Sequence, residues 1–291
     1  MTNPKYKDML FRFFLNNNRE YLLELYNALN DSHYTDPDEL EVNTLEDVIF
    51  MNMKNDMSFI IDSTLNLYEQ QSTYCPNMPI RGLEYLASVI RGIIKDADIY
   101  SSKLIKIPTP KYVVFYNGLE KKEDRIVQKL SDSFKIATDD PCLECKALML
   151  NINAGHNKEL LERSKFLFGY SEYIDLVREY SKTMSMDAAA NKAIDECIAQ
   201  GNPLADFLSK HRAEVFNLTI TEYDEERHMA TVRQEGFEEG ETRGREEGRE
   251  EGREETLNKV LDLLERGYNY EQIKKLRESG ALVVAEPTPK K

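Results

Sequence analysis

The chain has 291 residues, 41% of them hydrophobic and 10% aromatic, and a formal net charge of −14 at pH 7. This composition argues for a globular core and against disorder, and the length suits one large domain with an appendage. Because no run of about 18 apolar residues occurs and the first residues lack a signal-peptide core, we expect a cytoplasmic protein without a membrane segment and with reduced cysteines.

The first part of the chain predicts helices followed by an extended segment. Apolar residues recur at helical spacing between Tyr6 and Leu29, which predicts one long helix, or two short helices broken near residues 16–18. Asp8 lies at the start, where a carboxylate favours a helix N-terminus. After a polar loop, residues 40–53 are predicted to be extended and to lead into a third strand beside the hairpin that follows.

Residues 55–72 predict a β-hairpin with a turn at Asp62-Ser63. With a two-residue loop, the numbers of paired residues sum to 125, so Asp56 faces Glu69, and Gln71 projects from the same face as Glu69. Two facing carboxylates repel each other unless a cation lies between them, and Mg²⁺ prefers such hard oxygen ligands. The hairpin therefore predicts a metal site at Asp56 and Glu69.

The next segment predicts a crossover helix and two further strands. Asn77 is expected to cap a helix that carries Pro79 in its first turn and runs to about residue 95. Arg81, in the first turn of that helix, is expected either to contact phosphate or to pair with a core acid. Residues 111–117 and 144–153 predict buried strands, and residues 119–137 a charged turn and a short helix.

Charge is unevenly distributed in this segment. Residues 103–135 hold eight basic and four acidic side chains, so this stretch is locally positive in an acidic protein. A local basic face is compatible with phosphate contacts, although the overall charge argues against tight non-specific DNA binding.

The second half of the sequence predicts helices throughout. One helix is expected over residues 187–200, ending at Gly201, and another from Ala205 through Arg233. A tail follows in which glycine recurs every fourth residue from Gly236 to Gly252, before a final helical hairpin. We therefore divide the chain into a core (1–155), a helical extension packed on it (156–233) and a charged tail (234–291).

The glycine repeat of the tail leaves two interpretations open. Each glycine costs a helix about 1 kcal/mol relative to alanine. Glu–Arg pairs at i,i+4 return only about 0.2–0.5 kcal/mol each. The repeat is thus either a frayed, solvated helix or a helix that pairs closely with a copy of itself, and we expect a homodimer through the tail.

Asp56, followed by Glu69-Gln70-Gln71, resembles the active-site pattern of the PD-(D/E)xK nuclease superfamily. The segments 69–73 (Glu-Gln-Gln-Ser-Thr), 77–81 (Asn-Met-Pro-Ile-Arg) and 115–118 (Phe-Tyr-Asn-Gly), with the Glu/Gly/Arg-rich tail, are similar to the recombination-promoting nuclease family (Rpn, or YhgA-like transposases). The resemblance covers roughly residues 5–255.

This resemblance implies an α/β fold of the PD-(D/E)xK (restriction-endonuclease-like) type, with a mixed central sheet flanked by helices. It implies a bacterial endonuclease that hydrolyses DNA with Mg²⁺ or Mn²⁺ in recombination or transposition. In the family the Asp and Glu hold the metal, here Asp56 and Glu69, and the third catalytic position is Gln71 where most of the superfamily has Lys. In this family an acidic residue near the position of Asp8 is often counted with the active site. Asp8 therefore has two alternative roles, an active-site acid or a carboxylate that favours the start of a helix.

Two other functions remain open. The chain is compatible with a catalytically weak or inactive relative that binds DNA or protein, because glutamine orients a water but carries no charge. It is also compatible with a structural oligomer whose hairpin carboxylates are simply solvated. Zinc and nucleotide sites have little support, because the Cys142/Cys145 pair lacks a second ligand pair and no glycine-rich phosphate loop occurs.

Overall fold

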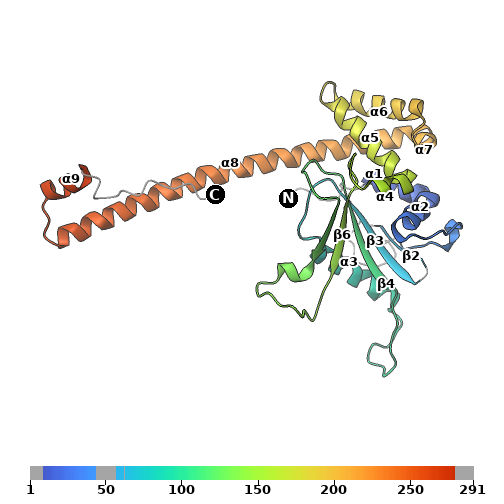
Figure 1. The fold of residues 1–291 in the computed structure, drawn as a ribbon, viewed down its shortest axis with the longest axis horizontal. Coiled ribbons are helices and arrows are strands. Elements are labelled where there is room, and N and C mark those ends of the chain that lie inside the picture. The colour runs from blue at the N-terminus through green and yellow to red at the C-terminus, as the bar shows by residue number, and fades with distance from the viewer. Residues whose placement is uncertain (1–8, 44–56, 62, 279–291) are drawn as a thin grey trace. The chain divides into compact units, whose positions relative to one another are not determined.

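The protein has an α/β fold built on a mixed β-sheet (Figure 1). A computed structural model describes residues 9–43, 57–61 and 63–278. Within these residues the sheet has six strands in the order β1-β2-β3-β4-β6-β5. The strands are β1 (Glu41–Asn43), β2 (Met57–Ile61), β3 (Thr64–Gln71), β4 (Thr109–Tyr116), β5 (Arg125–Lys129) and β6 (Lys146–Asn151). Strands β1, β2 and β3 form an antiparallel meander, β4 and β6 run parallel to β3, and β5 is an antiparallel edge strand.

The predicted hairpin is present as β2 and β3. Its pairs run from Met57↔Tyr68 to Ile61↔Thr64, so every pair has the predicted sum of 125. Ser63 adopts a left-handed conformation with φ 58°, as a tight turn requires. Asp56, Asp62 and Asp8 lie outside the described residues, and so does the predicted pairing of Asp56 with Glu69.

The N-terminal helical region consists of two short helices, α1 (Met9–Asn17) and α2 (Arg19–Asn30), with the break at Asn18. The Asn18 side chain accepts hydrogen bonds from the N–H groups of Glu20 (3.0 Å) and Tyr21 (3.3 Å). This capping ends one helix and starts the next, so the two-helix form of the prediction is confirmed.

Helix α3 (Met78–Ile93) connects β3 to β4 and carries Pro79 in its first turn, as predicted. Asn77 occupies the N-cap position, as predicted, but its side chain makes no capping hydrogen bond. Asn77 has φ −92° and ψ 14° instead of the extended backbone that side-chain capping needs, and its carbonyl accepts from the N–H groups of Ile80 and Arg81.

The charged segment 119–137 differs from its prediction. Instead of a short α-helix it contains the edge strand β5, followed by a 3-10 turn at Leu130–Ser133. Along β5, Gln128 points inward while Arg125 and Lys129 are exposed, which is the period-two pattern of a strand. The charged residues masked this alternation in the sequence.

The second half is helical, as predicted. Its helices are α4 (Lys158–Arg163), α5 (Lys165–Ser181), α6 (Met186–Gln200), α7 (Ala205–Lys210), α8 (Arg212–Glu265) and α9 (Tyr270–Glu278). Helix α6 ends at Gly201, whose φ of 72° suits glycine. The expected single helix from Ala205 is wrong, because the chain breaks at His211 between α7 and α8. Helix α8 continues through the glycine repeat, and α9 follows it, so both predicted helical segments are present, while their packing as a terminal hairpin stays a prediction.

Two hydrophobic cores lie on opposite faces of the sheet. The larger one joins α1, α2 and α5–α7 to side chains of the sheet such as Phe59, Tyr68 and Phe115. The smaller one lies under α3 and includes Leu67, Tyr85 and Tyr112. Because the larger core contains residues from Leu10 to Val215, the sheet, helices α4–α7 and the start of α8 pack as one body.

By its internal contacts the chain separates into two units, Met1–Glu226 and Arg227–Lys291. The finer division at residues 155 and 233 stays a prediction. No helix within the described residues combines the length and apolar character needed to cross a bilayer.

Candidate functional site

Glu69 is a fully buried carboxylate near the carboxyl end of β3. Side chains alternate along the strand, so Leu67, Glu69 and Gln71 share the face covered by α3. Tyr68 and Gln70 point to the opposite face, where Gln70 donates to Asn117 Oδ1 (2.5 Å). The sequence prediction that Glu69 and Gln71 share a face is confirmed.

Three side chains donate to the Glu69 carboxylate. Gln71 Nε2 donates to Oε1 (2.6 Å), Arg81 forms a salt bridge with the same oxygen, and the Tyr112 hydroxyl donates to Oε2. The Arg81 guanidinium also donates to the Tyr85 hydroxyl, from Nε (3.1 Å) and from Nη2 (3.0 Å). These contacts join β3, β4 and α3 around one buried acid.

A buried carboxylate is costly unless it is paired and hydrogen-bonded, and Glu69 is both. Arg81 supplies the compensating positive charge, and a third of its side chain remains exposed. Of the two roles predicted for Arg81, the salt bridge to a core acid is therefore present. Its contact with phosphate stays a prediction.

Tyr112 and Tyr85 were missed by the sequence analysis. The register pairs Leu67 with Tyr112 in the parallel β3–β4 ladder, so Tyr112 lies diagonally beside Glu69 on the same face. The alternation of Tyr112, Val114 and Tyr116 shows that these side chains share a face. It does not show which residues of β3 they meet.

The structure describes two residues of the predicted metal and catalytic site, Glu69 and Gln71. Glu69 and Gln71 place a carboxylate and an amide oxygen, ligand types that suit Mg²⁺ or Mn²⁺, on one face and two residues apart. No group of three or more His, Cys, Asp or Glu side chains with metal-binding geometry occurs in the parts of the chain that the structure describes. The donors thus fit such an ion in kind, and the second carboxylate of the predicted site, Asp56, lies outside the described residues.

A second polar pair joins Asp124 and His156, near the carboxyl end of β6. His156 Nδ1 lies 2.6 Å from Asp124 Oδ1, and the N–H of Asn157 donates to Oδ2 (3.3 Å). The hydrogen bond from His156, with that from Asn157, lowers the pKa of the Asp124 carboxyl. Both side chains are largely exposed, so this pair fastens a surface loop.

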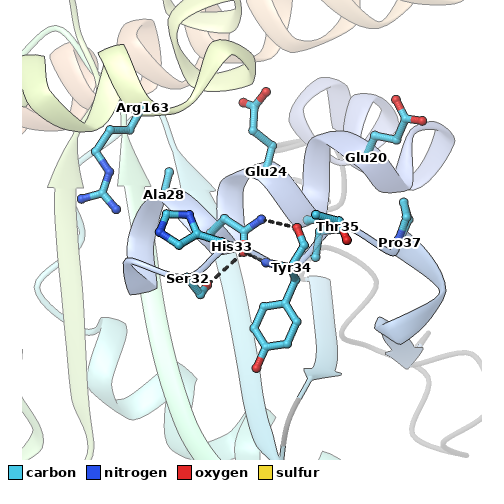
Figure 2. A pocket seen from close by; sticks show the side chains of 11 residues that line it. Glu20, Glu24, Ala28, Ser32, His33, Tyr34, Thr35, Pro37 and Arg163 are labelled. Carbon is cyan, nitrogen blue, oxygen red and sulfur yellow. Dashed lines mark hydrogen bonds between the residues drawn. The ribbon is translucent and has the colours of Figure 1, made fainter.

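A hollow of about 480 Å³ lies between α2, the loop after it and Arg163 (Figure 2). Its polar groups already serve the fold. Asn27 bonds to Ser32 and Tyr34 of the loop, and Glu24 accepts from the N–H of Phe166 at the start of α5 (2.9 Å). These bonds account for the conformation of the loop after α2. Glu69 is therefore the better candidate for a catalytic residue.

Comparison with known proteins finds no matching family model, no matching curated protein and no matching solved structure.

Proposed function

We propose that the protein is a Mg²⁺- or Mn²⁺-dependent DNA endonuclease of the PD-(D/E)xK type, close to the recombination-promoting nucleases. The observation that carries the proposal is the position of Glu69. This buried acid lies on the third strand of an antiparallel meander, and a helix then leads to a parallel strand, with Gln71 on the same face. That order of elements and that spacing are those expected from the resemblance.

In the proposed mechanism, Glu69 is a metal ligand together with Asp56. A bound divalent ion would polarise the scissile phosphate and lower the pKa of a water molecule. The contacts from Tyr112 and Gln71 fix the orientation of the Glu69 carboxylate before substrate arrives, which reduces the reorganisation needed in the reaction. Asp8 lies outside the described residues, and we keep it as a candidate additional acidic residue of the active site.

Gln71 and Arg81 together take the role that a lysine has elsewhere in the superfamily: Gln71 orients the water, and Arg81 supplies the positive charge. Gln71 Nε2 donates to Glu69, and the amide oxygen can accept from the attacking water. Gln71 carries no charge, but Arg81 places a guanidinium on the same carboxylate with part of its side chain exposed. We assign to Arg81 the contact with a phosphate oxygen, where a guanidinium binds in a two-pronged geometry.

The test is the Glu69→Gln variant in a plasmid-nicking assay with Mg²⁺ or Mn²⁺, with and without EDTA. Glutamine keeps the shape of the side chain and removes its charge, so we expect cleavage to fall at least ~100-fold, the scale of losing a catalytic electrostatic group. Glu84→Gln is the matched control, because Glu84 is exposed on α3. Equal cleavage by the wild type and Glu69→Gln would reject the proposal, and thermal melts of all three proteins would show whether they are folded.

A second candidate is a catalytically weak relative that binds DNA or protein. It is favoured by the Arg81 salt bridge, which already neutralises Glu69 in the absence of any metal. A wild-type protein that binds DNA in EDTA but shows no cleavage with either metal would support this candidate. A structural oligomer with neither property is the remaining alternative.

A further inference from the structure

A row of lysines crosses the face of the sheet opposite to Glu69. Lys111 on β4, Lys146 on β6 and Lys129 on β5 are all exposed. The ladders pair Val113 with Leu148 and Lys129 with Lys146, so the three lysines project from the same side of three neighbouring strands. Arg125 continues the row along β5. We call these four residues the basic face.

The three lysines of the basic face lie at the open end of this side of the sheet, and Arg125 lies at the other end of β5, opposite Leu150. Toward the carboxyl ends of β4 and β6 the same side is buried, with Phe115 and Leu150 in the larger core. Figure 1 shows α1, α4 and α5 gathered toward that end of the sheet. At the other end Val127 is 49% exposed, and the three lysines are exposed as well, although the last residue of α2, Asn30, reaches Lys111.

The basic face carries an electrostatic cost within the protein itself. Lys129 and Lys146 lie directly opposite each other, where like charges about 4.5–5.5 Å apart at Cβ destabilise a sheet. Lys111 bonds to the uncharged amide of Asn30 (2.5 Å). Among the described residues none of these four cations forms a salt bridge, although the chain has 52 acidic and only 38 basic residues. An external anion would relieve the repulsion.

Protection of the sheet edge does not explain the whole row. Lysines and arginines on an edge strand hinder pairing with other chains, which accounts for Lys129 and Arg125 on β5. Lys146 and Lys111 lie on the interior strands β6 and β4, which have partners on both sides. Their charge therefore needs a different reason.

We propose that the basic face binds the phosphate backbone of duplex DNA, separately from the Glu69 site. Neighbouring strands lie about 4.8 Å apart, so the row offers closely spaced cations along about 10 Å, a pattern suited to a repeating polyanion. Binding to a lipid surface would need large apolar side chains between the lysines. On β5 the exposed apolar side chain is that of Val127, which is small. The choice of DNA rests on the proposed function, and the binding itself requires no cleavage.

The experiment measures binding of a fluorescent 30-base-pair duplex by anisotropy in EDTA at several salt concentrations. In Lys129→Glu the new carboxylate faces Lys146 as a favourable pair, so the melting temperature should stay equal or rise. DNA affinity should nevertheless fall about 10-fold, and the salt dependence should weaken by about one released ion or more. Lys165→Glu, at an exposed lysine in the first turn of α5, changes the net charge equally and should bind like the wild type. Lys146→Glu should reproduce the loss.

Equal DNA affinity of Lys129→Glu and Lys165→Glu would overturn the proposal. So would a loss of binding to anionic phosphatidylserine vesicles in Lys129→Glu while DNA affinity stays unchanged. The two proposals fail separately, because binding is measured in EDTA, where no divalent ion is available for cleavage. If the wild type binds the duplex but does not cleave DNA, the proposed nuclease function is rejected and the proposed DNA binding by the basic face is kept.

Discussion

A glycine makes room for the hydroxyl that binds Glu69. A Cβ built on Gly82 of α3 would overlap the ring of Tyr112 at Cδ1 and Cε1. Because Gly82 lacks this atom, α3 lies close enough to the sheet for Arg81 and Tyr112 to meet the same carboxylate. The donors of the site thus depend on a residue that has no functional group.

We predict that Gly82→Ala destabilises the protein. Alanine is favoured in a helix by about 1 kcal/mol, but pushing apart a packed ring and helix typically costs about 1–3 kcal/mol, and displacing the Tyr112 hydroxyl adds a further loss. Chemical denaturation would measure the difference. Tyr112→Phe, which keeps the ring and removes the hydroxyl, is the companion variant. A Gly82→Ala protein as stable as the wild type would show that Tyr112 has room to move.

At this scale the sequence predicted the residues close to each other along the chain. Glu69 and Gln71 follow from the two-residue period of a strand, and Arg81 from its place in the first turn of α3. Tyr112 does not follow, because its contact with Glu69 depends on the register between β3 and β4, which local patterns do not encode. The same holds for Lys129 and Lys146, which meet only through the β5–β6 ladder.

At the scale of elements, two asparagines at the N-cap positions of helices behave differently. Asn18 has an extended backbone and caps α2 with its side chain, whereas Asn77 precedes α3 without a side-chain bond. Residue type alone predicted a cap at Asn77. Backbone conformation decides whether the cap forms, and Pro79 and the buried Met78 already define the start of α3.

We predict that Asn18→Ala costs about 1 kcal/mol of unfolding free energy, the usual effect of losing an N-cap. Asn77→Ala should cost less than about 0.5 kcal/mol, since no side-chain bond is lost. Urea denaturation of both variants would check this order. A larger cost for Asn77→Ala than for Asn18→Ala would mean that the cap at Asn77 forms in solution.

Segments with a strong hydrophobic periodicity were predicted correctly, whereas segments that mix charged and apolar residues were not. The β2–β3 hairpin has two apolar runs around a short polar turn, so its register followed from loop length alone. Strand β5 (Arg-Ile-Val-Gln-Lys) has a charged residue at each end and only one buried residue, Gln128, and its identity as a strand comes from pairing with β6. The break at His211 likewise had no glycine or proline to announce it.

At the scale of the whole molecule, the two faces of the sheet are used differently. One face holds Glu69 beneath α3, and the other carries the larger core at one end and the basic face at the other. Each buried charge on the first face has a partner, while the cations on the second do not pair with acids in the described residues. Cleavage and DNA retention are therefore assigned to different surfaces, which makes them separable by mutation.

The last prediction concerns the tail. Both hydrophobic cores consist of described residues between Leu10 and Val215, so deleting residues 235–291 removes none of their members. We expect the truncated protein to fold and to melt within about 4 °C of the full chain, a shift that corresponds to at most about 1–2 kcal/mol in a domain of this size. A truncation that fails to fold would show that the tail contributes to the core.

Assembly should change with the same deletion. An added Cβ at Gly240 or Gly244 of α8 would have open space around it, so this stripe is available for close approach of a second helix. We expect light scattering to show a dimer for the full chain and a monomer for the truncation at micromolar concentration. The control is full-length protein with Gly240→Ala and Gly244→Ala, whose helix gains about 1 kcal/mol per substitution. A dimer weakened by the alanines would place the contact on the glycine stripe, because their helix is more stable and cannot have been lost by unfolding. Equal masses for all three proteins would contradict dimerisation through the tail.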